Sequence, residues 1–194
     1  MGLHTLSAFM IYALVNAFTP GPGNILALNT MTNIGWRRGK SLFFGIFVGY
    51  YFVQVLCAIF VFSLDSLINP VMGSLKYVGS AYIVWLAYRI LVSAPGMKTT
   101  EKSPHFLIGF MLQVVNVKIY LFGITALTSF VTPYYSTFGA FLFFEMVIAT
   151  IGTIATLVWI LFGKVFHKAY LKYFRIINGV LAILLVLSAI GLFF

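Results

Sequence analysis

The chain has 194 residues, of which 62% are hydrophobic and only 8% are charged, and its mean hydropathy is +1.06. Soluble domains carry about 25% charged residues, so this composition excludes a soluble protein and indicates a single polytopic membrane domain spanning residues 1–194. The net charge of +9 lies mostly in short loops between apolar runs, which favours contact with anionic lipids over binding of nucleic acid.

The first apolar segment, about Leu3–Asn33, is interrupted near its middle. Two prolines there lack a backbone N–H and two glycines hold a helix poorly, so the hydrogen-bond ladder must open. Non-helical chain at membrane depth is tolerated only inside protein or along a cavity, so we expect a substrate site; the alternative is a kink relieved by neighbouring helices. We expect Asn24 to cap the second half-helix and to donate to a carboxylate. The expected binding residues here are Pro20, Gly21, Pro22, Gly23 and Asn24.

The second segment, about Ser41–Leu64, contains a Gly-x-x-x-Gly pattern that predicts close helix packing. The third, about Pro70–Val92, carries Lys76, which either reaches the outer surface or takes part in ion coupling. Tyr82 lies deeper in this segment and is a candidate for lining the substrate site.

The fourth segment, about His105–Thr132, is interrupted near Asn116–Lys118. Gln113 and Asn116 are three residues apart and share a helix face. A lysine inside a span costs about 2.5–3.5 kcal/mol on insertion scales and by default marks a functional site. We therefore expect Gln113, Asn116 and Lys118 to bind substrate, with a structural ion pair as the alternative for the lysine.

The fifth segment is about Thr137–Phe162 and the sixth about Tyr173–Phe194. Glu145 lies within the fifth. It is expected either to pair with Lys118 or Lys76, or to carry a coupling proton, and the sequence leaves both roles open.

The loops after the first, third and fifth segments hold every basic residue except Lys76 and Lys118. By the positive-inside tendency that side is cytoplasmic, and both termini are outside. The six segments divide into halves of about 1–94 and 104–194, each opening with an interrupted segment. Each half has three spans, an odd number, so two similar halves must lie in opposite orientations in the membrane. We therefore expect an all-α fold of two inverted three-helix repeats with the first and fourth helices interrupted.

Signatures of enzymes are missing from the sequence: it has no Gly-x-Ser-x-Gly, Walker lysine loop or His-Glu-x-x-His pattern. The three histidines are scattered without cysteine or carboxylate companions, so we expect neither a metal site nor another cofactor.

These motifs resemble the LysE/RhtB family of amino-acid exporters along essentially the whole chain. The resemblance is carried by the Thr19–Asn24 motif, the Leu75–Leu86 block and the Gln113–Lys118 motif. The family's second motif usually reads Asn-Pro-Lys; here Val117 replaces the proline, so we expect a milder second break. The surrounding residues and the chain length are similar to the cysteine/O-acetylserine exporter subgroup in particular.

The resemblance implies secondary-active export of small neutral amino acids across a bacterial inner membrane, driven by an ion gradient with protons as the expected ion. The substrate carboxylate would sit on the half-helix N-terminus at Gly21–Asn24, helped by Lys118, and its ammonium would face carbonyls freed at the breaks and Glu145. The alternatives are an exporter of homoserine, threonine or lysine, and a passive channel or facilitator. Expected partners are the substrate and membrane lipids, and a homodimer is left open.

Overall fold

The computed structural model describes residues 1–63, 105–165 and 167–190, and residues 77, 80, 81, 83–85, 87, 88 and 90–92 between them. All regular structure in these residues is helical, as predicted. The elements are α1 (Leu3–Phe18), α2 (Pro22–Asn33), α3 (Trp36–Ser63), α5 (Phe106–Val114), α6 (Val117–Ala126), the π-helix η2 (Leu127–Val131), α7 (Phe138–Val165) and α8 (His167–Ile190). Most of the expected third segment, including Lys76 and Tyr82, lies outside the described residues.

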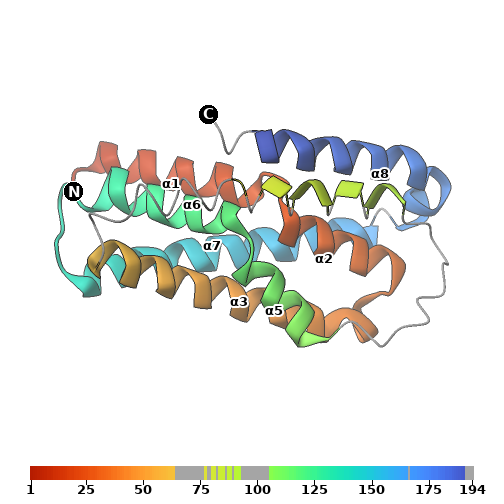
Figure 1. Ribbon diagram of the computed structural model, residues 1–194, viewed down its shortest axis with the longest axis horizontal. Coiled ribbons are helices and arrows are strands. Elements are labelled where there is room, and N and C mark those ends of the chain that lie inside the picture. The colour runs from red at the N-terminus through yellow and green to blue at the C-terminus, as the bar shows by residue number, and fades with distance from the viewer. Residues whose placement is uncertain are drawn as a thin grey trace.

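Two helices run the length of the bundle, and two other passes are each divided in the middle (Figure 1). The undivided helices α3 and α7 each have 28 residues. The divided passes are α1 with α2 and α5 with α6, and they run in opposite directions. This arrangement agrees with inverted halves, while the complete six-helix repeat stays a prediction because its third helix is not described.

The first break is shorter than the sequence predicted. Helix α2 begins at Pro22, since proline has no N–H to lose at the first helical position, and Gly21 before it is extended. The non-helical chain is therefore confined to residues 19–21. Asn24, expected at the cap, lies instead within the first turn of α2.

The second break forms without a proline. Helix α5 ends at Val114 and α6 begins at Val117, and the two axes differ by 53°. The N–H of Asn116 donates to the Gln113 carbonyl over 3.0 Å, and its side-chain amide donates to Gln113 Oε1. These local bonds compete with the helical ladder and turn the chain.

The Gly-x-x-x-Gly pattern of Gly45 and Gly49 lies where α3 crosses α5, which confirms the predicted close packing. A Cβ on Gly45 would collide with the Phe106 carbonyl, and one on Gly109 would collide with the Leu42 carbonyl. The two backbones are thus nearly in contact. This approach places Gln113 of α5 directly against Gly49.

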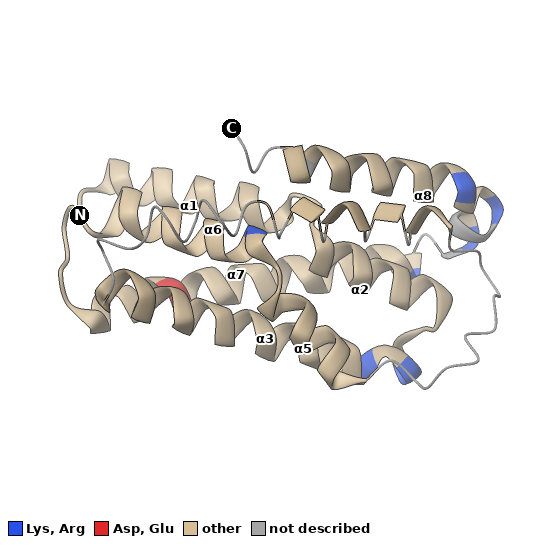
Figure 2. Ribbon diagram, viewed as in Figure 1, with Lys and Arg blue, Asp and Glu red and all other residues tan. Residues whose placement is uncertain are grey.

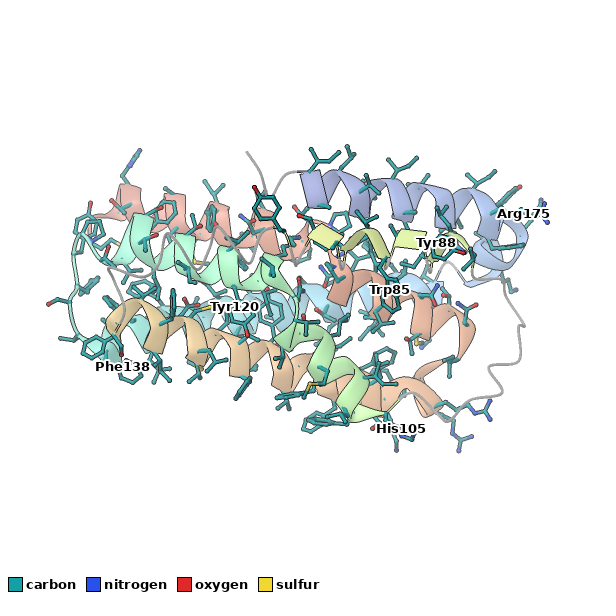
Figure 3. All side chains as sticks on the ribbon, in the orientation of Figure 1. Trp85, Tyr88, His105, Tyr120, Phe138 and Arg175 are labelled. Atoms are coloured by element: carbon teal, nitrogen blue, oxygen red, sulfur yellow. The ribbon has the colours of Figure 1, made fainter. Side chains whose placement is uncertain are left out.

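By length and composition, α3 and α7 can each cross a membrane, and the bent α5–α6 pair can form one further span; only described residues enter this count. Basic residues at the start of α3, the end of α7 and the start of α8 gather at one end of the bundle (Figure 2). His105 and Arg175 lie at this same end, and Phe138 lies at the other (Figure 3). The expected gathering of loop charge on one side therefore holds for the described basic loops.

Candidate functional site

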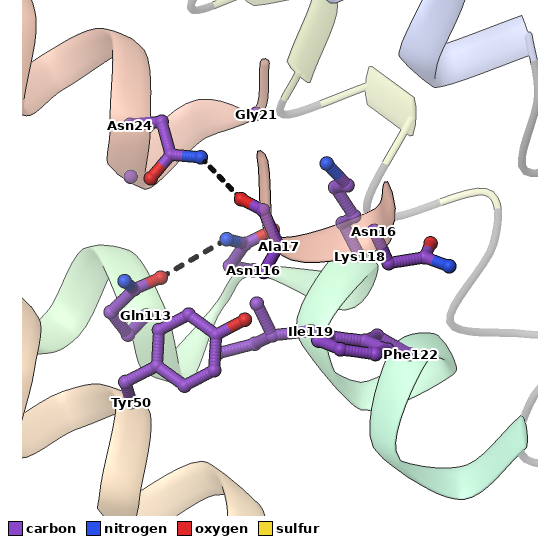
Figure 4. A pocket seen from close by; sticks show the side chains of 11 residues that line it. Asn16, Ala17, Gly21, Asn24, Tyr50, Gln113, Asn116, Lys118, Ile119 and Phe122 are labelled. Atoms are coloured by element: carbon purple, nitrogen blue, oxygen red, sulfur yellow. Dashed lines mark hydrogen bonds between the residues drawn. The ribbon is translucent and has the colours of Figure 1, made fainter. Parts of the chain in front are cut away.

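The two breaks meet at one cavity, which encloses about 310 Å³ of empty space, counting the part open to solvent. Residues from both broken passes and from α3 surround it (Figure 4). The lining consists of Asn16, Ala17, Gly21, Gly23, Asn24, Tyr50, Gln113, Asn116, Lys118, Ile119 and Phe122. Six of the residues expected to bind substrate are thus brought together, while Pro20 and Pro22 shape the backbone without lining the cavity.

The N-termini of α2 and α6 both border this cavity, and neither is capped by a side chain. Gly21, the N-cap of α2, has no side chain to offer, and Asn116, the N-cap of α6, directs its amide to Gln113. The first N–H groups of a helix have no partner within the helix, and they carry a partial positive charge. Two positive helix ends therefore face the same space.

Asn24 does not cap α2, contrary to the prediction, because the helix begins two residues earlier. Its side chain turns back and donates to the Ala17 carbonyl over 2.9 Å. Its Oδ1 accepts a hydrogen bond of 2.9 Å from Thr156 on α7. Asn24 is buried, and it joins the end of α1 to α2 and α7.

Two further carbonyls at the first break already have side-chain donors. Trp159 Nε1 of α7 donates to the Phe18 carbonyl over 3.3 Å, and Lys118 Nζ donates to the Thr19 carbonyl over 2.9 Å. In this conformation the Phe18 and Thr19 carbonyls thus have protein donors, and the expectation that carbonyls freed at the breaks face a substrate ammonium stays a prediction. The side chain of Lys118 packs beside Gly21.

Gln113 and Asn116 form the opposite wall of the cavity. They are 1% and 3% exposed, and Asn116 Nδ2 donates to Gln113 Oε1 over 3.0 Å. A Cβ on Gly23 would lie only 2.7 Å from Gln113 Nε2, so α2 and α5 approach closely here. Asn116 Oδ1 is buried and accepts no hydrogen bond within the described chain. Asn116, which lines the cavity, thus carries one unused acceptor.

Glu145 does not pair with Lys118, so that predicted ion pair is wrong. Its carboxylate is fully buried, is not part of the cavity lining, and has no hydrogen-bond partner among the described residues. The other expected partner, Lys76, lies outside the described residues, as does the candidate lining residue Tyr82.

Several residues around the cavity were not expected from the sequence. Tyr50 lines it directly, and Thr156 and Trp159 hold the first break in place. Thr156 belongs to a stripe of threonines at helical spacing in α7, a pattern that predicts a side facing protein rather than lipid, and its burial agrees with this. Tyr50 has no such pattern, because one tyrosine in an aromatic-rich helix is not distinctive.

Comparison with known proteins gives one family match and a set of relatives. A family described as "LysE type translocator" matches residues 14–194. The chain is 42% identical over 190 residues to a protein of Salmonella typhi named cysteine/O-acetylserine efflux protein, and 40% identical to the protein of that name in Shigella flexneri. Both alignments cover 97% of each chain. No solved structure matches.

Proposed function

Since the chain belongs to the LysE type translocator family, we propose that it is a secondary-active exporter of small neutral amino acids, with cysteine and O-acetylserine as substrates. The chain is an integral membrane transporter and not an enzyme. The relatives named cysteine/O-acetylserine efflux proteins match nearly its entire length, which supports this substrate class.

The observation that carries the proposal is the convergence of two uncapped helix N-termini and one lysine on a single cavity. Such helix ends bind anionic groups through free N–H donors and the helix dipole. In our proposal the substrate carboxylate lies against the N–H groups of Gly23 and Asn24, within reach of the Lys118 ammonium. A carboxylate there would bring the lysine a charged partner in addition to the Thr19 carbonyl.

The remaining groups of the cavity suit the rest of a small amino acid. Asn116 Oδ1 is the buried acceptor without a donor, so we assign it to the substrate ammonium. Tyr50, Ile119 and Phe122 supply an apolar wall for the substrate side chain. Burial against these residues favours a short side chain such as the –CH2SH group of cysteine.

The absence of carboxylates from the described lining argues against lysine as the substrate. A second ammonium in the cavity would have no counter-ion there, and desolvating an unpaired charge is costly. Homoserine and threonine remain alternatives, because they are neutral and similar in size. A passive facilitator could use the same cavity, and it differs from an exporter only in its dependence on an energy source.

We further propose that the broken passes rock about the cavity to give alternating access, powered by a proton gradient. The protein would lie in the bacterial inner membrane, with the basic end of the bundle in the cytoplasm and both termini outside. The gathering of described basic residues at one end supports this orientation.

Uptake of labelled cysteine or O-acetylserine into inverted membrane vesicles tests the proposal. Energised vesicles holding the wild-type protein should accumulate substrate above its external concentration, and an uncoupler should abolish the accumulation. Lys118→Ala should lose uptake at a normal membrane level, whereas Lys168→Ala, at the exposed basic end, should not. Equilibration without accumulation would identify a facilitator, and normal uptake by Lys118→Ala would place the site elsewhere.

A further inference from the structure

A second polar cluster lies inside the bundle, next to the cavity but not part of it. Glu145 on α7 is fully buried, and neither carboxylate oxygen has a hydrogen-bond partner among the described residues. Among the residues that the structure describes, the titratable groups close enough to interact with it are Tyr12 on α1 and Tyr50 and Cys57 on α3, none of which carries a positive charge. An ionised carboxylate there would be uncompensated, which is very costly in an apolar interior.

Gln54 on α3 completes the cluster. It is fully buried, and its Oε1 likewise has no donor. A Cβ on Gly123 of α6 would collide with Gln54 Oε1 and would lie 3.0 Å from each oxygen of Glu145. Oxygens from α3 and α7 therefore face the same glycine, and every one of them is an acceptor.

One proton on the carboxyl supplies the donor that this cluster needs. A neutral carboxyl has one O–H, which can be donated to the Gln54 oxygen, and it carries no charge to compensate. A metal ion suits the cluster less well, because hard cations such as Ca²⁺ take about 6–8 oxygen ligands. The helical carbonyls nearby are engaged, and the Ile119 carbonyl also accepts Gln54 Nε2 at 3.5 Å.

The cluster is linked to the cavity through the same two helices. Ile119 lines the cavity and accepts the Gln54 amide, and Gly123 follows it by one helical turn, about 5.4 Å. On α3, Tyr50 lines the cavity and Gln54 lies one turn further along. A shift of α6 or α3 during alternating access would therefore alter the surroundings of Glu145.

We propose that Glu145, with Gln54 as its hydrogen-bond acceptor, is the proton-binding site that couples export to the proton gradient; this rests on the proposed function. The proton binds a Glu145 oxygen from the outer side, forming one O–H bond. The neutral, substrate-free protein then returns to the inward-facing state. There the O–H bond breaks, the proton leaves to the cytoplasm, and substrate binds for export.

Two assays in reconstituted liposomes distinguish the proton coupling from the movement of substrate across the membrane. Counterflow of labelled cysteine at equal pH needs only substrate exchange, whereas accumulation driven by a pH gradient needs the coupling proton. Glu145→Gln keeps the shape of a neutral carboxyl, so the empty protein should return without a proton. Because the proposal requires a neutral side chain at position 145 only for that return step, the variant should retain counterflow and lose gradient-driven accumulation. Thr153→Val is a matched change on the same helix, at a hydroxyl without a partner in the described chain, and should retain both activities.

Gly123→Ala provides a second variant, because its methyl group would separate the Gln54 oxygen from Glu145. It should likewise retain counterflow and lose gradient-driven accumulation. Accumulation by Glu145→Gln equal to that of the wild-type protein would overturn the coupling proposal. Loss of counterflow by both variants at normal protein levels would also overturn it, since the cluster would then be needed for translocation itself. Absence of counterflow in the wild-type protein would instead refute the proposed function.

Discussion

Replacement of Gly23 by alanine tests how closely the two broken passes are fitted around the cavity. A Cβ at this position would lie 2.7 Å from Gln113 Nε2 and 3.2 Å from Gln113 Oε1. The first distance is too short for a real contact, so the Gln113 amide must move. That movement breaks the 3.0 Å hydrogen bond that Gln113 accepts from Asn116.

The structure sets the scale of the effect. A buried hydrogen bond contributes about 0.5–1.5 kcal/mol, and overpacking costs about 1–3 kcal/mol. The flexible Gln113 side chain relieves part of the overpacking, and alanine suits a helix better than glycine, so we expect the protein to fold. The displaced amide and the added methyl group should instead weaken substrate binding. Because a loss of about 1.4 kcal/mol of binding free energy weakens affinity tenfold, we expect KM to rise about tenfold or more.

The assay is the initial rate of gradient-driven cysteine uptake into inverted vesicles, measured over a range of substrate concentrations. Gly179→Ala in α8 is the matched control, because a Cβ there meets nothing within 4 Å. It should leave KM unchanged. A Gly23→Ala protein with the KM of the wild type would refute the view that this contact shapes the binding site.

Three further predictions concern packing and hydrogen bonds between helices. The first and third are checked by thermal unfolding of purified protein in detergent, and the second by the level of protein in the membrane. Asn24→Ala removes the side-chain donor to the buried Ala17 carbonyl at the end of α1 and should destabilise the protein by about 1–3 kcal/mol. An unchanged unfolding midpoint would contradict this. Gly109→Ala drives a methyl group into the α3 backbone, so membrane levels should fall sharply, in contrast to Gly179→Ala. Trp159→Phe removes one hydrogen bond to α1 and should cost about 0.5–1.5 kcal/mol, and a larger loss would indicate a further role for the indole.

The position of the first break could be predicted from the sequence because backbone chemistry decides it locally. Proline and glycine open a helix wherever they fall, so the first break followed from residues 20–24 alone. The role of Asn24 did not follow, because it depends on where α2 begins. With Pro22 at the first helical position, the asparagine moves from the cap into the first turn and faces α1 instead.

Partners of the buried polar residues could not be predicted, because they depend on which helices meet. Lys118 and Glu145 carry opposite charges in neighbouring segments, which made an ion pair a reasonable hypothesis. The bend at Asn116 instead directs the lysine to the end of α1, whereas Glu145 faces Gly123 and Gln54. Gln54 itself could have been noticed, since a buried amide within a span usually has a specific partner.

The most direct test of the account is an experimental structure of the protein with bound cysteine or O-acetylserine. We predict that the substrate carboxylate lies at the N–H groups of Gly23 and Asn24 and that its ammonium lies at Asn116 Oδ1. Substrate bound outside the cavity between the two breaks, or bound there with its carboxylate directed away from the N-termini of α2 and α6, would contradict the account.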